Sequence, residues 1–218
     1  ASRRSQDISA LDELYTELIN KRTELAKNAG FENYRDYKFK EMGRFDYGTE
    51  SCFDFHNAVE KHIVPLVKGI QQKKLKKLKK ERFRPWDTTV NPDGKAPLKP
   101  FKTGKEMLDQ TIAIFDQVDS KFAGFLKTME KMEHFDLESK PGKAPGGYNY
   151  PLYESGAPFI FMNSVGSQND FTTMIHEGGH AVHSFLTHGL ELTSFKSFPS
   201  EIAELASMSM ELLTMDYW

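Results

Sequence analysis

The sequence predicts a mainly helical fold that contains one small β-sheet or hairpin. Apolar side chains recur every three or four positions through residues 8–28 and 103–132, which is the period of an amphipathic helix. Residues 148–162 depart from this period, because aromatic residues and short apolar runs there are typical of a hairpin. With 39% hydrophobic and 12% aromatic residues, the 218-residue chain can bury a core.

Composition also limits the partners and the compartment. The formal net charge of -2 gives the chain no general attraction to nucleic acid or to a membrane surface. The single cysteine, Cys52, excludes an internal disulfide framework and fits a reducing compartment. Residues 1–11 lack the apolar centre of a signal peptide, and no apolar run approaches a membrane span. We therefore expect a cytoplasmic protein without nucleic-acid or membrane partners.

The N-terminal part is expected to be helical. Residues 8–28 form the first helix, which should end near Gly30. Residues 31–40 form a second, shorter helix. A third begins at about Glu50, and Pro65 should kink or break it, because proline has no backbone N–H and crowds the preceding turn.

A basic stretch follows at residues 68–84, with nine lysine and arginine side chains. Such a run suggests a surface for nucleic acid or a membrane. We favour a solvated helix face with a narrow apolar seam at Leu75 and Leu78, because the stretch lacks interleaved aromatic residues and a basic partner elsewhere.

Loops rich in proline and glycine are expected at residues 91–100 and 139–147, the second leading into the hairpin. The hairpin should turn around residues 154–156. Because proline cannot donate a ladder bond, the segment 156–162 is expected at a sheet edge, where free backbone groups can pair with an extended peptide. A hairpin that only covers the core explains the pattern nearly as well. The candidate substrate-binding residues are Gly156, Ala157, Pro158 and Phe159.

Residues 169–189 are expected to form one helix, with Asp170 as its N-cap and Gly189 at its end. This helix contains the motif HEGGH, a match to H-E-x-x-H. Positions four apart on a helix lie on one face, so His176 and His180 can bind a single metal ion. Glu177, one position on, can face a water molecule at that ion.

The alternative is a buried helix whose histidines are only hydrogen-bonded. Gly178 and Gly179 count against it, because each glycine costs a helix interior about 0.5–1 kcal/mol relative to alanine. Their missing side chains instead let another group approach the backbone closely.

Residues 200–218 are expected to form a final helix that supplies a third ligand. Catalytic zinc commonly takes two histidines and one glutamate, and leaves the fourth position to water. Glu201 and Glu204 lie three apart, so spacing alone does not choose between them. Glu211, two turns beyond Glu204, is either a group that orients a ligand imidazole or an ordinary solvated glutamate.

Such a site predicts hydrolysis of peptide bonds. Zinc lowers the pKa of a bound water towards about 7 and polarises a carbonyl. Glu177 would take the proton of that water and pass it to the leaving amine. Cys52 is not needed as a nucleophile.

These motifs resemble the oligoendopeptidase F and thimet oligopeptidase family of zinc metallopeptidases, and most closely its bacterial oligoendopeptidase F branch. The resemblance rests on HEGGH followed by His183 and on EIAELAS at residues 201–207. It also includes GFENYRDYKF at residues 30–39, RPWD at 84–87 and GKAPGGYNY at 142–150. It implies a zincin-like catalytic core with one zinc ion and oligopeptide substrates. The implied ligands are His176, His180 and Glu204, the base is Glu177, and Glu201 and His183 are further candidates beside the ligands.

The resemblance also implies that the family's flanking N- and C-terminal parts are absent from this chain. We expect one partial catalytic domain: residues 1–138 mainly helical, 139–168 loop and hairpin, 169–189 the motif helix, and 200–218 the third-ligand helix. The predicted function is a zinc metalloendopeptidase acting on short peptides. Two alternatives stay open, a zinc exopeptidase with the same ligands and a fragment that binds zinc and peptide without turnover.

Overall fold

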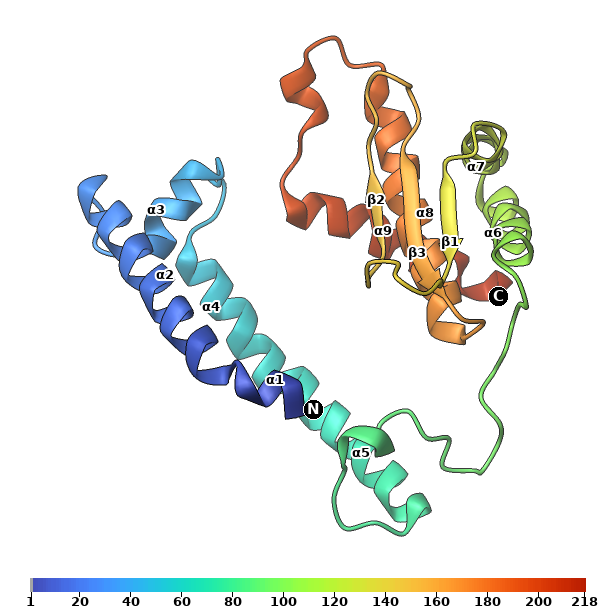
Figure 1. The fold of residues 1–218 in the computed structure, drawn as a ribbon, viewed down its shortest axis with the longest axis horizontal. Coiled ribbons are helices and arrows are strands. Elements are labelled where there is room, and N and C mark those ends of the chain that lie inside the picture. The colour runs from blue at the N-terminus through green and yellow to red at the C-terminus, as the bar shows by residue number, and fades with distance from the viewer. Residues whose placement is uncertain (1) are drawn as a thin grey trace. The chain divides into compact units, whose positions relative to one another are not determined.

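A computed structural model describes residues 2–218, which form two compact units that divide between Asp93 and Gly94 (Figure 1). The chain is mainly helical with one small sheet, as the sequence predicts. No helix within residues 2–218 is both long and apolar enough to cross a membrane.

The first unit contains helices only. Its elements are α1 (Ser2–Gln6), α2 (Ile8–Asn28), α3 (Tyr34–Glu41), α4 (Thr49–Ala58), the π-helical segment η1 (Val59–Ile63), α5 (Val64–Leu78) and the short 3-10 turn η2 (Pro85–Asp87). The second helix begins later than expected, because the side chain of Asn33 accepts a hydrogen bond from the amide of Asp36 and caps α3 there.

Pro65 does not break the third helix. The chain stays helical from α4 into α5, and widens to a π-helical segment just before the proline. In this segment the amide of Val64 donates to the carbonyl of Val59, five residues back. The wider turn accommodates a residue that has no N–H and whose ring crowds the carbonyl of Lys61.

The second unit contains the sheet and the remaining helices. Its elements are α6 (Gly104–Val118), α7 (Ser120–Lys131), β1 (Phe135–Glu138), β2 (Tyr148–Tyr150), β3 (Phe159–Ser164), α8 (Gln168–His188), η3 (Thr193–Lys196), α9 (Ser200–Thr214) and η4 (Met215–Tyr217). The helical stretch expected over residues 103–132 is divided at Asp119. That residue is extended (φ -162°, ψ 125°), and its side chain accepts from the amide of Lys121 to start α7.

The three strands form a mixed sheet in the order β1-β3-β2 (Figure 1). β1 pairs with β3 in parallel, and β2 pairs with β3 as the expected antiparallel hairpin, with Tyr150 opposite Phe159. The predicted edge position of residues 156–162 is wrong, because β3 is the central strand. Pro158 precedes the first residue of β3, so its missing N–H costs no ladder bond. β2 is the edge strand on the hairpin side.

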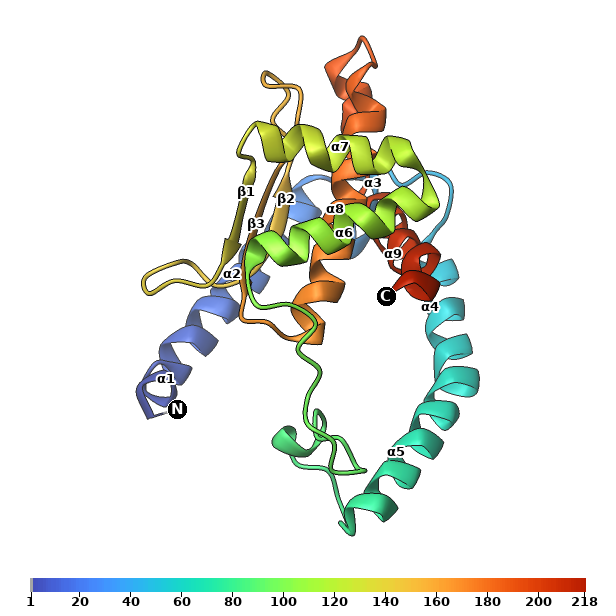
Figure 2. The same cartoon turned by 90° about the vertical axis from the view of Figure 1, so that its right-hand side faces the viewer.

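The core of the second unit lies between the sheet and α8. Alternate residues of β3, Ile160, Met162 and Ser164, are buried, as expected for one covered sheet face. Helix α8 packs against β2, β3, α6, α7 and, most extensively, α9. Figure 2 shows α6 and α7 running across α8 on one side of this unit. The motif helix is therefore held on several sides.

Candidate metal centre

Helix α8 carries the HEGGH motif with well-defined ends. The sequence predicts Asp170 as its N-cap, but the N-cap in the structure is Ser167. The Ser167 hydroxyl accepts from the amide of Asp170, and the Asp170 carboxylate accepts from the amides of Ser167 and Val165. This reciprocal capping box starts the helix three residues earlier than an Asp170 cap would. Gly189 caps the C-terminal end, as expected.

The two glycines of the motif bring neighbouring elements close to α8. A Cβ atom added at Gly179 would lie 2.8 Å from Cα of Ser207 and 3.0 Å from Cβ of Met210, both on α9. A Cβ at Gly178 would lie 2.8 Å from the Phe115 ring on α6. Only glycine permits this approach, so the helix-propensity cost of the pair is offset by tight packing against α9.

This packing brings three metal-binding side chains together. Nε2 of His176 lies 3.2 Å from one carboxylate oxygen of Glu204, and Nε2 of His180 lies 3.8 Å from the other. The two imidazole rings are nearly perpendicular, with centroids 4.8 Å apart. One ligand atom from each of His176, His180 and Glu204 lies within 4.8 Å of the others, and no other such group of three is found among residues 2–218.

Glu211, two turns along α9 from Glu204, contacts the ring nitrogen of His176 that does not face Glu204. Its Oε1 lies 2.7 Å from Nδ1 of His176. A carboxylate at this position accepts the Nδ1 proton, which fixes the tautomer and leaves Nε2 as a lone-pair donor towards Glu204 and His180. Its geometry is that expected of a group that orients a ligand imidazole.

The donor set fits zinc. Two imidazole nitrogens and one carboxylate oxygen match the ligand set of catalytic zinc sites, which keep a fourth position open. Burial, together with the nearby His176, lowers the pKa of His180, although the Glu204 carboxylate acts in the opposite direction. The neutral imidazole that metal binding requires is therefore favoured at His180. The Glu204 side chain is 53% exposed, so the cluster is open to solvent on one side.

Glu177 lies beside this cluster in a drier environment. The residue is only 7% exposed, and burial raises the pKa of its carboxyl group, although the nearby His176 acts to lower it. A backbone hydrogen bond from Asn149, on the edge strand β2, also lowers its pKa. Glu177 therefore connects the motif helix with the edge of the sheet.

Asn149 is a residue that sequence reasoning missed. Its Nδ2 atom is buried and has no hydrogen-bond partner among residues 2–218. With His180 and Ser184 it lines a pocket of about 260 Å³. Its sequence signal was its place in GKAPGGYNY, five residues before the expected hairpin turn at 154–156.

The other candidates lie outside the cluster. Glu201 is not one of the three converging residues, and its carboxylate accepts from the hydroxyl of Ser200. The His183 ring stacks on Phe198 with centroids 4.0 Å apart, and its buried Nδ1 has no partner within residues 2–218.

The four substrate-binding candidates lie at the start of the central strand. Gly156 has a φ of +78°, and Ala157 is buried. The carbonyl of Pro158 lies 3.0 Å from Nδ1 of His134, and Phe159 pairs with Tyr150. Because β3 lies between β1 and β2, it has no free backbone groups along its edges for a peptide to pair with. The argument for peptide binding therefore applies to the edge strand β2 and not to these residues.

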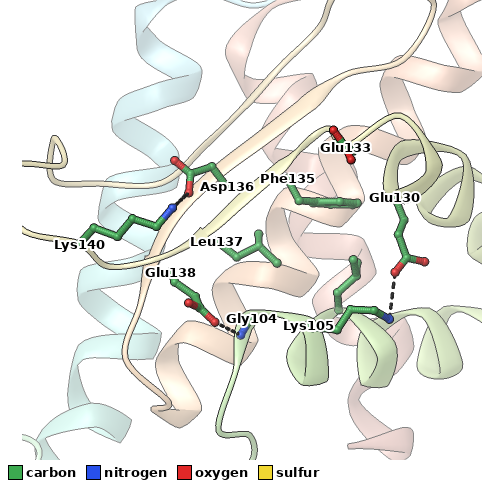
Figure 3. A pocket seen from close by; sticks show the side chains of 10 residues that line it. Gly104, Lys105, Glu130, Glu133, Phe135, Asp136, Leu137, Glu138 and Lys140 are labelled. Carbon is green, nitrogen blue, oxygen red and sulfur yellow. Dashed lines mark hydrogen bonds and ion pairs between the residues drawn. The ribbon is translucent and has the colours of Figure 1, made fainter.

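A larger pocket of about 350 Å³ lies away from the metal centre, against β1 (Figure 3). Both lysines of this pocket pair with acidic groups: Nζ of Lys105 lies 2.9 Å from Glu130, and Nζ of Lys140 lies 3.2 Å from Asp136. The amide of Gly104 donates to Glu138. Because these groups already have partners, the pocket offers no converging metal ligands.

Replacing Glu211 with glutamine is expected to weaken zinc binding by about 10–100-fold, because the amide no longer acts as a charged acceptor for the His176 imidazole. Competition with a zinc chelator measures the change. Glu191→Gln, at an exposed glutamate between α8 and α9, is the matched control and should bind zinc like the unaltered protein. Equal affinities in the two variants would contradict the assigned role of Glu211.

Known proteins are similar to this chain in sequence and in fold. The profile of Peptidase family M3 matches residues 2–218. "Oligoendopeptidase F, plasmid" of Lactococcus lactis subsp. cremoris is 28% identical over 111 residues, 51% of this chain and 18% of that protein. Oligopeptidase PepF of Bacillus subtilis (strain 168) is 29% identical over 115 residues, 53% of this chain and 17% of that protein.

A solved structure is also similar to this chain in fold. "PZ peptidase A with inhibitor 2" superposes with a TM-score of 0.89 at 30% identity, covering 97% of this chain and 38% of that chain. The matched region is thus less than two fifths of that structure and, at 18% and 17%, less than a fifth of the two relatives. Because the family profile extends over residues 2–218, this chain belongs to Peptidase family M3.

Proposed function

We propose that this chain supplies the zinc ligands and the general base of a metalloendopeptidase that hydrolyses short peptides. Membership of Peptidase family M3 implies a metallopeptidase. The observation that carries the residue assignment is the convergence of His176, His180 and Glu204 beside a buried glutamate.

In this proposal His176, His180 and Glu204 bind one zinc ion, and Glu211 orients His176. Zinc would act as a Lewis acid that activates water and polarises the peptide carbonyl. The chain's part is to hold three ligands from two helices in place. The close approach of α8 and α9 at Gly179 supports this role, since it sets the distance between the histidines and Glu204.

Glu177 is the proposed general base. It follows a ligand directly in the sequence, and its carboxyl group has a raised pKa because it is buried. A raised pKa makes a carboxylate a better proton acceptor near neutral pH. Glu177 would take a proton from the attacking water and then donate it to the nitrogen of the leaving amine, so that one group serves both steps.

The edge strand β2 is the proposed peptide-binding element. An extended peptide can pair with the free backbone groups of an edge strand, and such pairing gives affinity with little dependence on sequence. Helix α8, which carries Glu177, packs against this strand. The names of the relatives, oligoendopeptidase F and oligopeptidase PepF, agree with short peptide substrates.

An internally quenched peptide blocked at both ends tests this function. We expect the full-length protein, loaded with zinc, to cleave an internal bond of this peptide. An exopeptidase needs a free terminus, so cleavage only of unblocked peptides would replace the endopeptidase proposal with that alternative. Binding of the peptide without cleavage of any form would show a zinc-containing peptide-binding protein instead.

A further inference from the structure

The sheet has a second face, which points away from α8 and is rich in aromatic residues. Along β3, Phe159 and Phe161 alternate with the buried core residues and are only partly buried. Their partners on β2 are Tyr150 and Tyr148. Directly opposed residues of an antiparallel pair share a face, so these four rings form one surface, which we call the aromatic face.

The aromatic face is hollowed at the edge of the sheet. A pocket of about 460 Å³ is lined by Tyr148, Tyr150, Leu152 and Phe159. Tyr150 is 60% exposed and Tyr148 is 48% exposed, although both are large rings. None of the four lining residues carries a charge, so the pocket suits an uncharged, apolar group.

Contacts around the aromatic face hold it in place before any ligand arrives. The Tyr148 and Phe161 rings stack with centroids 5.1 Å apart at an interplanar angle of 11°. Nζ of Lys143 lies 4.3 Å from the centroid of Phe161 and donates to the carbonyls of Asp136 and Glu138. This lysine side chain is only 6% exposed.

Hydrogen bonds from Asn163 hold the loop that leads into β2. Nδ2 of Asn163 donates to the carbonyls of Ala144 and Gly146, each at 2.8 Å. The loop and the central strand are therefore joined on this face by Asn163 as well as by Lys143. A preorganised surface of this kind loses little conformational entropy when it binds a ligand.

The aromatic face is continuous with the proposed catalytic centre. Asn149 lies between Tyr148 and Tyr150 on β2, and β2 packs against α8, the helix that carries Glu177. Since side chains alternate along a strand, Asn149 projects to the opposite side, where it lines the pocket next to His180. On β2, Asn149 therefore borders the metal centre, and its neighbours Tyr148 and Tyr150 belong to the aromatic face.

We propose that Tyr148 and Tyr150 determine substrate specificity by binding aromatic or large aliphatic side chains of the peptide. This inference rests on the proposed function, in which the peptide pairs with β2. The side chains of a paired peptide alternate as those of β2 do, so every second one projects onto the aromatic face. A ring or a branched aliphatic chain there gains contact area and stacking that a serine or a charged side chain lacks.

Matched peptides test the proposal in the full-length protein. The peptides are blocked at both ends and internally quenched. Within each set they differ only in whether one position holds phenylalanine, leucine, serine or aspartate, and each set places this variable residue at a different position. We expect phenylalanine and leucine to exceed serine and aspartate by roughly tenfold in kcat/KM at positions two residues apart, mainly through KM. Tyr150→Ser should reduce this preference to about twofold, and Tyr150→Phe, which keeps the ring, should retain it.

Two further measurements make the outcome decisive. Leu152 lies in the loop after β2 and lines the same pocket, so Leu152→Ser should weaken the same preference. This variant replaces Tyr150→Ser in the test if Tyr150→Ser fails to fold. Binding of the phenylalanine and serine peptides to a Glu177→Gln variant reports recognition without turnover. An unchanged preference in Tyr150→Ser, or in Leu152→Ser, overturns the specificity proposal. Absence of hydrolysis with every peptide, while binding still depends on Tyr150, would overturn only the proposed catalytic function.

Discussion

Replacing Glu177 with glutamine is expected to lower kcat for peptide hydrolysis by about 10²–10⁴-fold while leaving one zinc ion bound. Glutamine has almost the shape of glutamate, but its amide cannot take a proton from water or return one to the leaving amine. The metal ligands His176, His180 and Glu204 are unchanged in this variant. Turnover of the blocked quenched peptide and elemental analysis of the same sample measure both quantities.

Glu191→Gln is the control for Glu177→Gln, because it makes the same chemical change at an exposed position. It should retain the activity and the zinc content of the unaltered protein. Glu177→Gln activity within a few-fold of that control would exclude Glu177 as the base. Loss of zinc together with activity would instead show that Glu177 helps to hold the metal.

Replacing Gly179 with alanine is expected to destabilise the protein by about 1–3 kcal/mol and to weaken zinc binding, although Gly179 is not a ligand. The added Cβ would lie 2.8 Å from Cα of Ser207, so the backbone of α9 must move. The Ser207 hydroxyl donates to the carbonyl of Glu204 and lies 3.4 Å from its carboxylate. A shift of Ser207 therefore displaces Glu204 from the two histidines. Urea unfolding and zinc competition measure the two effects.

Gly124→Ala is the matched control, since Gly124 lies within α7 and a Cβ there meets nothing within 4 Å. Alanine is a better helix former than glycine, so this control should be more stable by about 0.5–1 kcal/mol and bind zinc normally. If Gly179→Ala behaved like Gly124→Ala, the close approach of α8 and α9 would not be what positions Glu204.

The sequence was most informative where chemistry and helical spacing coincide. The four-residue interval between His176 and His180 is enough to place both side chains on one face of a helix. Spacing did not choose between Glu201 and Glu204, because both lie near one face of the same helix. The structure separates them through packing, since contact at Gly179 brings the part of α9 around Ser207 against α8.

The sheet was predicted less well, because strand order depends on contacts distant in the sequence. Pro158 suggested an edge strand, yet it lies just outside β3. The strand β1 pairs with β3 from 25 or more residues away, as in the pair Phe135 and Ile160. β1 has only four residues and therefore too few to show a period of two. The capping of α8 by Ser167 was missed because Asp170 is itself a favoured cap residue.

Anomalous scattering at the zinc edge, from crystals of the full-length protein grown with one equivalent of zinc, tests the metal centre most directly. We predict one strong peak within bonding distance of Nε2 of His176, Nε2 of His180 and the carboxylate of Glu204, the three groups that converge in the structure. A peak bound by other residues, or no peak between these three side chains, would contradict the proposed site and the peptidase function that depends on it.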